Sequence, residues 1–158
     1  MSLFISYLSF SYSGFTLFNK ICSKYIQILN KIKRKTLIVE DDSISYKLIY
    51  ELASPHTDKI IQLSDGKEAV NYFKKNGENI NLIVVDILLP KIDGLEVIKT
   101  IRKSHPKIPI IGISASTQVN KNDACYKAGC DLFVLKPIDV HSFEKIINQF
   151  LKKDPQIS

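Results

Sequence analysis

Five polar residues stand at the ends of short apolar runs, and their types suit phosphoryl transfer: Glu40, Asp41, Asp86, Ser114 and Lys136. Carboxylates gathered in one place repel one another, and a divalent cation removes that conflict. Mg²⁺ prefers oxygen ligands and is typically held by one or two carboxylates together with phosphate oxygens. A hydroxyl group can donate to a phosphoryl oxygen, and an ammonium group adds a compensating charge. Brought together, these side chains predict a Mg²⁺-assisted site at which a carboxylate accepts a phosphoryl group.

Short apolar runs alternate with stretches of helical period over most of the chain. The runs are nearly continuous, as expected for strands that are covered on both faces. We predict strands at 37–39, 60–63, 82–85, 108–113 and 132–135. We predict helices at 43–53, 67–76, 95–103, 118–128 and 142–151. Five βα units in series imply a doubly wound α/β fold, with a parallel sheet, right-handed crossovers and helices on both faces.

The carboxyl ends of parallel strands share one edge of the sheet, where the ligands of open α/β folds bind. Glu40 and Asp41 follow the first predicted strand, and Asp86 follows the third. Ser114 follows the fourth predicted strand, and Lys136 follows the fifth. We therefore expect the five side chains to converge at this edge, although they are far apart in the sequence.

Asp42 has two interpretations, because the end of the first strand is predicted only to within a residue. A shift by one position would make Asp42 a metal ligand in place of Asp41. Asp is also a preferred N-cap residue, and Asp42 directly precedes the predicted helix at 43–53. We favour the N-cap for Asp42 and keep Asp41 as the ligand.

The composition is that of a chain able to fill a hydrophobic core, with 45% hydrophobic and 24% charged residues. The net charge is +6, but the first 35 residues hold six of the 22 Lys and Arg residues and none of the 16 acidic residues. The rest of the chain is neutral, so its charge does not indicate a nucleic-acid-binding domain. Cys22, Cys125 and Cys130 match no zinc-binding pattern, and we interpret them as reduced structural cysteines.

Residues 1–34 differ in character from the rest, and we interpret them as a hydrophobic and basic arm. Residues 1–19 carry no charge but include five serines, and a spanning helix needs about 20 predominantly apolar residues. Apolar residues then recur at helical spacing from Phe18 to Ile32, which predicts an amphipathic helix. Three roles are open for it: a partner or dimer helix, a weak contact of residues 1–32 with a membrane surface, or a stub packed on the domain.

Four runs at predicted strand ends carry a family resemblance: LIVEDD at 37–42, VVDILLPKIDG at 84–94, IGISA at 111–115 and FVLKPI at 133–138. They resemble, in order, the four signatures of bacterial two-component response-regulator receiver domains. The resemblance covers residues 35–152 and leaves a short tail at 153–158. It implies a flavodoxin-like (βα)5 fold with strand order 2-1-3-4-5, to which the arm would be added at the N-terminus.

The resemblance also implies a role for each acidic residue. Asp86 would be the phosphoacceptor and a metal ligand. Asp41 would bind the metal directly and Glu40 through water, while Leu88 would offer its backbone carbonyl. Glu40 stands where the family commonly has Asp, and Leu88 stands where Met is frequent; neither change removes a required group.

The remaining site residues are implied in the same way. Ser114, where the family most often has Thr, would hydrogen-bond the phosphoryl group, and Lys136 would pair with it. Ser114 and Phe133 would be the switch residues, with Phe133 at the aromatic position. The bond between Lys136 and Pro137 would be cis, for which X–Pro is the one common setting.

These roles imply a cytoplasmic phosphorelay module and not an enzyme, with at most slow self-dephosphorylation. A histidine kinase or histidine phosphotransfer domain would donate to Asp86 with Mg²⁺ bound, and the added charge would switch a protein-binding face. The chain ends soon after the last predicted helix, so we expect no DNA-binding effector and no nucleic-acid partner. It would be a stand-alone regulator or the receiver of a hybrid kinase, with its downstream target open.

Two functions of other classes stay open. The first is an interaction module that does not depend on phosphorylation and works through the arm, which could also associate with a membrane. The second is a Mg²⁺-dependent phosphohydrolase, which would need turnover on small phosphate esters. Asp86→Ala separates the first from the phosphorelay, and sustained phosphate release would indicate the second.

Overall fold

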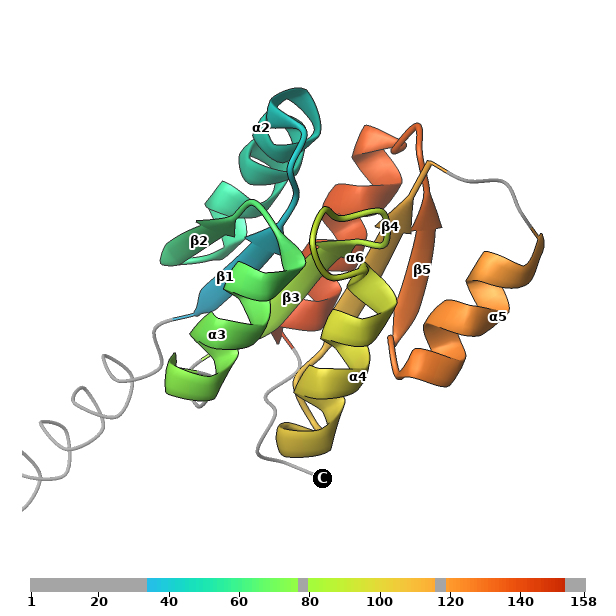
Figure 1. Ribbon diagram of the computed structural model, residues 1–158. Coiled ribbons are helices and arrows are strands. Elements are labelled where there is room, and N and C mark those ends of the chain that lie inside the picture. Colours follow the sequence, from blue (N-terminus) through green and yellow to red (C-terminus); the bar gives the residue numbers. More distant parts are fainter. Residues whose placement is uncertain (1–33, 77–79, 116–118, 153–158) are drawn as a thin grey trace, which may run out of the picture. The chain divides into compact units, whose positions relative to one another are not determined.

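The computed structural model describes residues 34–76, 80–115 and 119–152, and a five-stranded sheet lies at their centre (Figure 1). These residues belong to one compact unit, Arg34–Ser158. The predicted arm at 1–34, apart from Arg34, lies outside the described residues, and so does the predicted tail at 153–158. The boundaries of arm and tail therefore stay predictions.

All strands of the sheet pair in parallel, in the order β2-β1-β3-β4-β5. Their bounds are Lys35–Val39 for β1, Lys59–Leu63 for β2, Leu82–Asp86 for β3, Ile110–Ser114 for β4 and Leu132–Leu135 for β5. The predicted order is confirmed. Every residue of β3 and β4 is buried, which agrees with apolar runs that are covered on both faces. Strand β4 begins two residues later than predicted, because Ile108 and Pro109 belong to the preceding loop. The Ile108 carbonyl accepts a hydrogen bond from Arg102 Nη1 at 2.8 Å.

The described residues form five α-helices and one short 3₁₀ helix, of which the last α-helix follows β5 and the others lie between strands. Their bounds are Ser43–Ala53 for α2, Ser54–His56 for η1, Gly66–Asn76 for α3, Gly94–Ser104 for α4, Val119–Ala128 for α5 and Val140–Lys152 for α6. Helix α6 begins two residues earlier than the apolar period indicates. The backbone N–H of Ser142 donates to Asp139 Oδ1 at 2.8 Å, so a polar cap determines where this helix starts.

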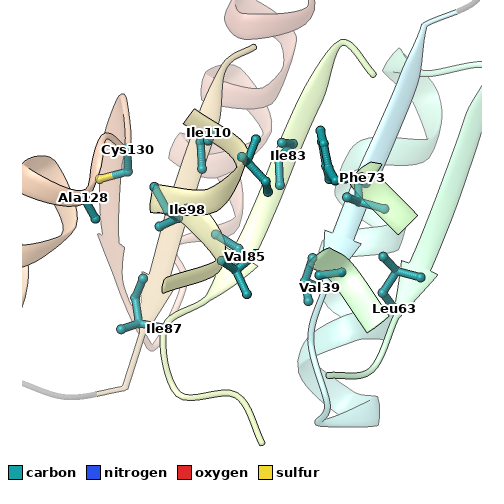
Figure 2. Packing of buried hydrophobic residues seen from close by; sticks show 14 of the residues in the cluster. Val39, Leu63, Phe73, Ile83, Val85, Ile87, Ile98, Ile110, Ala128 and Cys130 are labelled. Atoms are coloured by element: carbon teal, nitrogen blue, oxygen red, sulfur yellow. The ribbon is translucent and has the colours of Figure 1, made fainter. Parts of the chain in front are cut away.

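The helices cover the sheet in two layers, and each layer encloses its own part of the core (Figure 1). Helices α2 and α6 pack on one face, where Ile49, Phe143 and Ile147 are buried. Helices α3, α4 and α5 pack on the other face. Figure 2 shows this second cluster, in which Ile98 lies beside the strand residues Val85 and Ile110, and Phe73 lies nearer to Val39. Burial on both faces fixes the sheet rigidly, so the strand ends hold their side chains in defined places.

Local signals mark the ends of several elements, and the predicted cap at Asp42 is among them. Asp42 is the N-cap of α2, and its Oδ1 accepts the Ser45 N–H at 2.7 Å. Such a cap contributes about 1 kcal/mol to stability. Gly129, with φ of 107°, ends α5 in the left-handed region, as a C-terminal cap requires. The peptide bond between Lys136 and Pro137 is cis, as the family resemblance implies.

Candidate functional site

Polar residues gather at the carboxyl edge of the sheet, as predicted from the order of the strands. Glu40 follows β1 and is 1% exposed, while Asp86 ends β3 and is 6% exposed. Ser114 ends β4 and is fully buried. Lys136 follows β5, and its backbone N–H donates to the Ser114 carbonyl at 2.8 Å. Two carboxylates, a hydroxyl group and an ammonium group thus come from four different strand ends.

Lys136 joins the two buried carboxylates. Its Nζ donates to Oδ2 of Asp86 at 2.6 Å and to Oε2 of Glu40 at 2.8 Å. A third hydrogen bond runs from Nζ to the Ser45 hydroxyl at 3.2 Å. The Lys136 side chain is itself only 18% exposed, so the attraction is weakly screened by solvent. The geometry places one positive charge between two negative ones.

The charges of the site shift the pKa values of its members. Burial is the largest influence on Glu40 and raises the pKa of its carboxyl group, and the nearby charge of Asp86 adds to the shift. The hydrogen bond from Lys136 opposes this rise without cancelling it. Burial also disfavours the charged form of Lys136, but the hydrogen bonds to Asp86 and Glu40 outweigh it and raise the pKa of Lys136. Lys136 therefore stays positively charged between the two carboxylates.

The loop after β3 turns back on Asp86. The Leu88 N–H donates to Oδ1 of Asp86 at 2.7 Å, so both oxygens of the carboxylate are engaged. The Gly94 N–H donates to the Ile87 carbonyl at 3.0 Å and brings the start of α4 against the strand end. A Cβ at Gly94 would clash with the Asp86 carbonyl oxygen, so only glycine permits this approach. The side chain of Leu88 points outward and is 47% exposed.

The two predicted switch residues lie on neighbouring strands. Gly112 is paired with Phe133 in the register of β4 and β5, and Ser114 is paired with Leu135. Because alternate residues of a strand share a face, Ser114 and Phe133 belong to the same face of the sheet. Phe133 is partly buried against the core beneath α3, α4 and α5, and its N–H donates to Tyr126 Oη at 3.4 Å.

Asp41, the predicted direct metal ligand, is exposed beside Glu40 at the same edge. Among residues 34–76, 80–115 and 119–152, no three His, Cys, Asp or Glu side chains are grouped closely enough to hold a metal ion. Glu40 and Asp86 share Lys136 instead. The donors fit Mg²⁺ in kind, since they are carboxylates and a backbone carbonyl, and Mg²⁺ commonly takes one or two carboxylates and keeps several waters.

Two features at this edge were not predicted from the sequence. Ser45, in the first turn of α2, contacts Lys136, and no motif indicates it because the contact depends on how α2 packs. Lys91, with φ of 67°, forms an ion pair with the buried Asp65. Gly66, next to Asp65, donates its N–H to the Pro90 carbonyl at 3.3 Å. The loop before α3 therefore supports the loop that carries Leu88.

Within the part of the chain that the structure describes, no helix has the length and apolar character to cross a membrane.

Comparison with known proteins agrees with the fold. The family model for the response regulator receiver domain matches residues 36–148. The polar-differentiation response regulator DivK of Brucella ovis is 29% identical over 120 residues, which are 75% of this chain and 96% of DivK. The probable transcriptional regulator ycf27 of Cyanophora paradoxa is 33% identical over 124 residues, or 78% of this chain. This chain spans about half the length of such ycf27 relatives, 51% in this case.

Solved structures show the same architecture. A complex of CheX and CheY with BeF3 and magnesium from Borrelia burgdorferi contains a chain that is 28% identical, with a TM-score of 0.67. The match covers 75% of this chain and 90% of the other. The Mn²⁺-bound response regulator Rcp1 is 26% identical, with a TM-score of 0.64, over 77% of this chain and 96% of Rcp1. By its match to the family model and by its strand order, this chain belongs to the response regulator receiver domain family.

Proposed function

We propose that the chain works in a phosphorelay, in which Asp86 accepts a phosphoryl group from a histidine kinase or a histidine phosphotransfer protein. One observation carries the proposal: the buried carboxylate of Asp86 lies 2.6 Å from Nζ of Lys136 at the carboxyl edge of the sheet. A carboxylate in this position is a nucleophile, and the adjacent ammonium group is a partner for the incoming phosphoryl oxygens.

The transfer is a displacement at phosphorus. A carboxylate oxygen of Asp86 forms a bond to phosphorus while the bond from phosphorus to the donor nitrogen breaks. In such reactions positioning and charge neutralisation supply most of the catalysis. Lys136 neutralises part of the charge on the phosphoryl group, and the N–H of Leu88 holds one Asp86 oxygen in place. The chain is thus an acceptor of the group and not an enzyme that turns over a substrate.

Mg²⁺ is the cation that we propose for the site. Asp41 and Asp86 would bind it directly, Glu40 through water and Leu88 through its backbone carbonyl. The ion supplies positive charge against the phosphoryl oxygens and reduces the repulsion between the carboxylates. The exposed position of Asp41 leaves its carboxylate accessible to a hydrated ion.

The phosphoryl group would act as a switch through β4 and β5. Ser114 would donate its hydroxyl to a phosphoryl oxygen, and Phe133 would change position on the same face of the sheet. A new negative charge at Asp86 also competes with Glu40 for Lys136, which holds both carboxylates in the present arrangement. The surface formed by β5 and α5 would then change its affinity for a downstream protein.

The proposal is tested by incubating the full chain with acetyl phosphate and Mg²⁺ and separating the products on a Phos-tag gel. Wild type should give a shifted band, and Asp86→Asn should give none. Asp93→Asn is the matched control, because Asp93 lies on the same loop and Asn keeps its function as the N-cap of α4. It should shift as wild type does. An unshifted wild type, or a shift retained in Asp86→Asn, would contradict the proposal.

A further inference from the structure

Two cysteines meet at the junction of α5 and β5, away from the carboxyl edge. Cys125 lies in the last turns of α5 and is fully buried, and Cys130 precedes β5 and is 6% exposed. Both are free thiols in the core cluster beneath α3, α4 and α5. Figure 2 shows Cys130 in this cluster beside Ala128. The phosphorelay gives neither thiol a role.

The backbone between them holds the two cysteines together. Helix α5 ends in a Schellman motif, in which the Cys130 N–H donates to the Cys125 carbonyl at 3.1 Å and the Gly129 N–H donates to the Tyr126 carbonyl at 3.0 Å. In this motif, the two residues joined by the bond that spans more of the chain, here Cys125 and Cys130, commonly touch through their side chains. A disulfide requires the Cα atoms of its two cysteines to lie about 4.4 to 6.8 Å apart. A turn closed in this way brings the Cα atoms of Cys125 and Cys130 close to each other.

The side chains meet over a glycine of β4. A Cβ built at Gly112 would clash with Sγ of Cys125 and lie 3.9 Å from Cβ of Cys130. Both side chains thus face the space that Gly112 leaves open. Each thiol shifts the pKa of the other, as expected for two neighbouring groups. The two cysteines therefore lie side by side against Gly112, at the turn that joins α5 to β5.

The two thiols differ in chemical character. The hydrogen bond with Cys130 and burial both raise the pKa of Cys125, so this thiol stays protonated. The same hydrogen bond is the main cause that lowers the pKa of Cys130. Burial and the Asp131 carboxylate oppose this shift, and the Arg102 guanidinium group adds a smaller lowering. Arg102 is held nearby, since its Nε and Nη2 donate to the Gly129 carbonyl at 2.8 and 2.6 Å. Cys130 is also the more exposed of the two cysteines, at 6% against 0% for Cys125.

We propose that Cys125 and Cys130 form a redox site, which a peroxide oxidises to a disulfide within the α5–β5 turn. The Cys130 thiolate attacks one oxygen of hydrogen peroxide, the O–O bond breaks, and Cys130 becomes a sulfenic acid while hydroxide leaves and takes up a proton. The Cys125 sulfur then attacks the Cys130 sulfur, and the S–O bond breaks with loss of water. In sum, two thiols are oxidised to one disulfide and one peroxide is reduced to two water molecules.

The disulfide would tie α5 to the strand that carries Phe133. Tyr126 follows Cys125 directly, and its Oη already accepts the N–H of Phe133. A covalent bond at the same junction would restrict how far α5 moves relative to β5. The redox site itself does not depend on phosphorylation of Asp86, so the two proposals succeed or fail separately.

The experiment uses the full chain with Cys22→Ser, which leaves the pair as its only cysteines. The protein is treated with hydrogen peroxide, denatured and alkylated with a maleimide, and its mass is measured. We expect both maleimide labels to be lost after peroxide and regained after dithiothreitol. Trypsin cleaves after Lys127, between the two cysteines, so the oxidised protein should yield two peptides joined by a disulfide.

Two single variants test the assigned roles, each again with Cys22→Ser. In Cys125→Ser, the sulfenic acid on Cys130 has no partner and should be trapped by dimedone. In Cys130→Ser, Cys125 should stay unlabelled. The proposal is overturned if both thiols of the intact pair remain free at a peroxide exposure that converts glutathione to its disulfide. It is overturned as well if dimedone labels Cys125 instead, or if the disulfide joins two chains.

Discussion

Nζ of Lys136 lies 2.6 Å from Oδ2 of Asp86, and the same nitrogen lies 2.8 Å from Oε2 of Glu40. One ammonium group therefore serves two carboxylates that are almost fully buried. Charges taken out of water are costly unless they are paired, and a buried carboxylate that loses its partner is left with that cost. The contact that we propose for the phosphoryl group is thus also one on which the folded state depends.

Lys136→Met should lower the free energy of unfolding by about 2 to 4 kcal/mol, because it leaves Glu40 and Asp86 without their shared cation. Lys136→Met combined with Asp86→Asn should recover part of the loss, since a single buried carboxylate then remains. Urea unfolding at neutral pH measures both values. Lys99→Met is the control: Lys99 lies 3.8 Å from Glu96 on the surface, and such pairs contribute under about 1 kcal/mol. Equal losses at Lys136 and Lys99 would contradict the prediction.

Mg²⁺ should stabilise the folded chain, and the stabilisation should depend on Asp41. A ligand that binds only the folded state raises stability with its concentration relative to its Kd. Asp41→Asn removes an exposed negative charge without disturbing the core, and it should weaken Mg²⁺ binding by about tenfold, or about 1.4 kcal/mol. Thermal unfolding over a Mg²⁺ titration measures the effect. Asp93→Asn should match wild type, and an identical Mg²⁺ response in Asp41→Asn would remove Asp41 from the proposed ligands.

The fold could be predicted largely from the sequence, because apolar runs and helical periods report burial directly. Helix α2 has the predicted bounds, with Asp42 as its cap, and β5 also agrees at both ends. One difference lies where a polar group determines an end, as Asp139 does at the start of α6. Hydrophobic periodicity does not report such caps reliably.

The convergence of Glu40, Asp86, Ser114 and Lys136 could be predicted too, because parallel strands place their carboxyl ends at one edge. The partners that hold those residues could not. Ser45 reaches Lys136 through the packing of α2, and Lys91 reaches Asp65 only because its own backbone adopts a positive φ. Contacts of this kind depend on side-chain direction and loop path, which no local sequence pattern encodes.

Asp65 should give stability that is lost in acid. The hydrogen bond from Lys91, followed by the N–H of Glu68, holds the pKa of Asp65 below its ordinary value of 3.8. When folding lowers the pKa of a carboxyl group, the group stabilises the fold fully at any pH above its pKa in the unfolded state. This contribution disappears as the pH falls through its pKa in the folded state. Asp65→Asn should therefore be less stable than wild type at pH 7. The difference in free energy of unfolding between the two proteins should narrow below about pH 3.8.

Urea unfolding of both proteins from neutral pH downward measures this gap. Lys91→Met provides the matched variant, because it leaves Asp65 its bond from Glu68 and removes only the ion pair. The loss of stability in Lys91→Met relative to wild type should be smaller than the loss in Asp65→Asn, and it should disappear over the same acidic range. A gap that stays constant with pH would show that Asp65 acts through its shape and not through its charge.

Gly112→Ala should destabilise the chain by about 1 to 3 kcal/mol. This is opposite to the usual preference, since alanine is normally more favourable than glycine in a strand. The added Cβ would clash with Sγ of Cys125 and lie 3.2 Å from Cδ1 of Ile87, and both neighbours are fully buried. Cys125→Ala removes the clashing sulfur, so the double variant should be more stable than the two single losses together indicate, by at least about 0.5 kcal/mol. Cys130→Ala keeps its Cβ at the ordinary distance of 3.9 Å and should not rescue Gly112→Ala. Urea unfolding of the single and double variants measures the coupling energy between Gly112→Ala and each cysteine substitution. If Cys130→Ala rescued Gly112→Ala as much as Cys125→Ala does, the rescue would come from general loosening of the core and not from removal of the Cys125 sulfur.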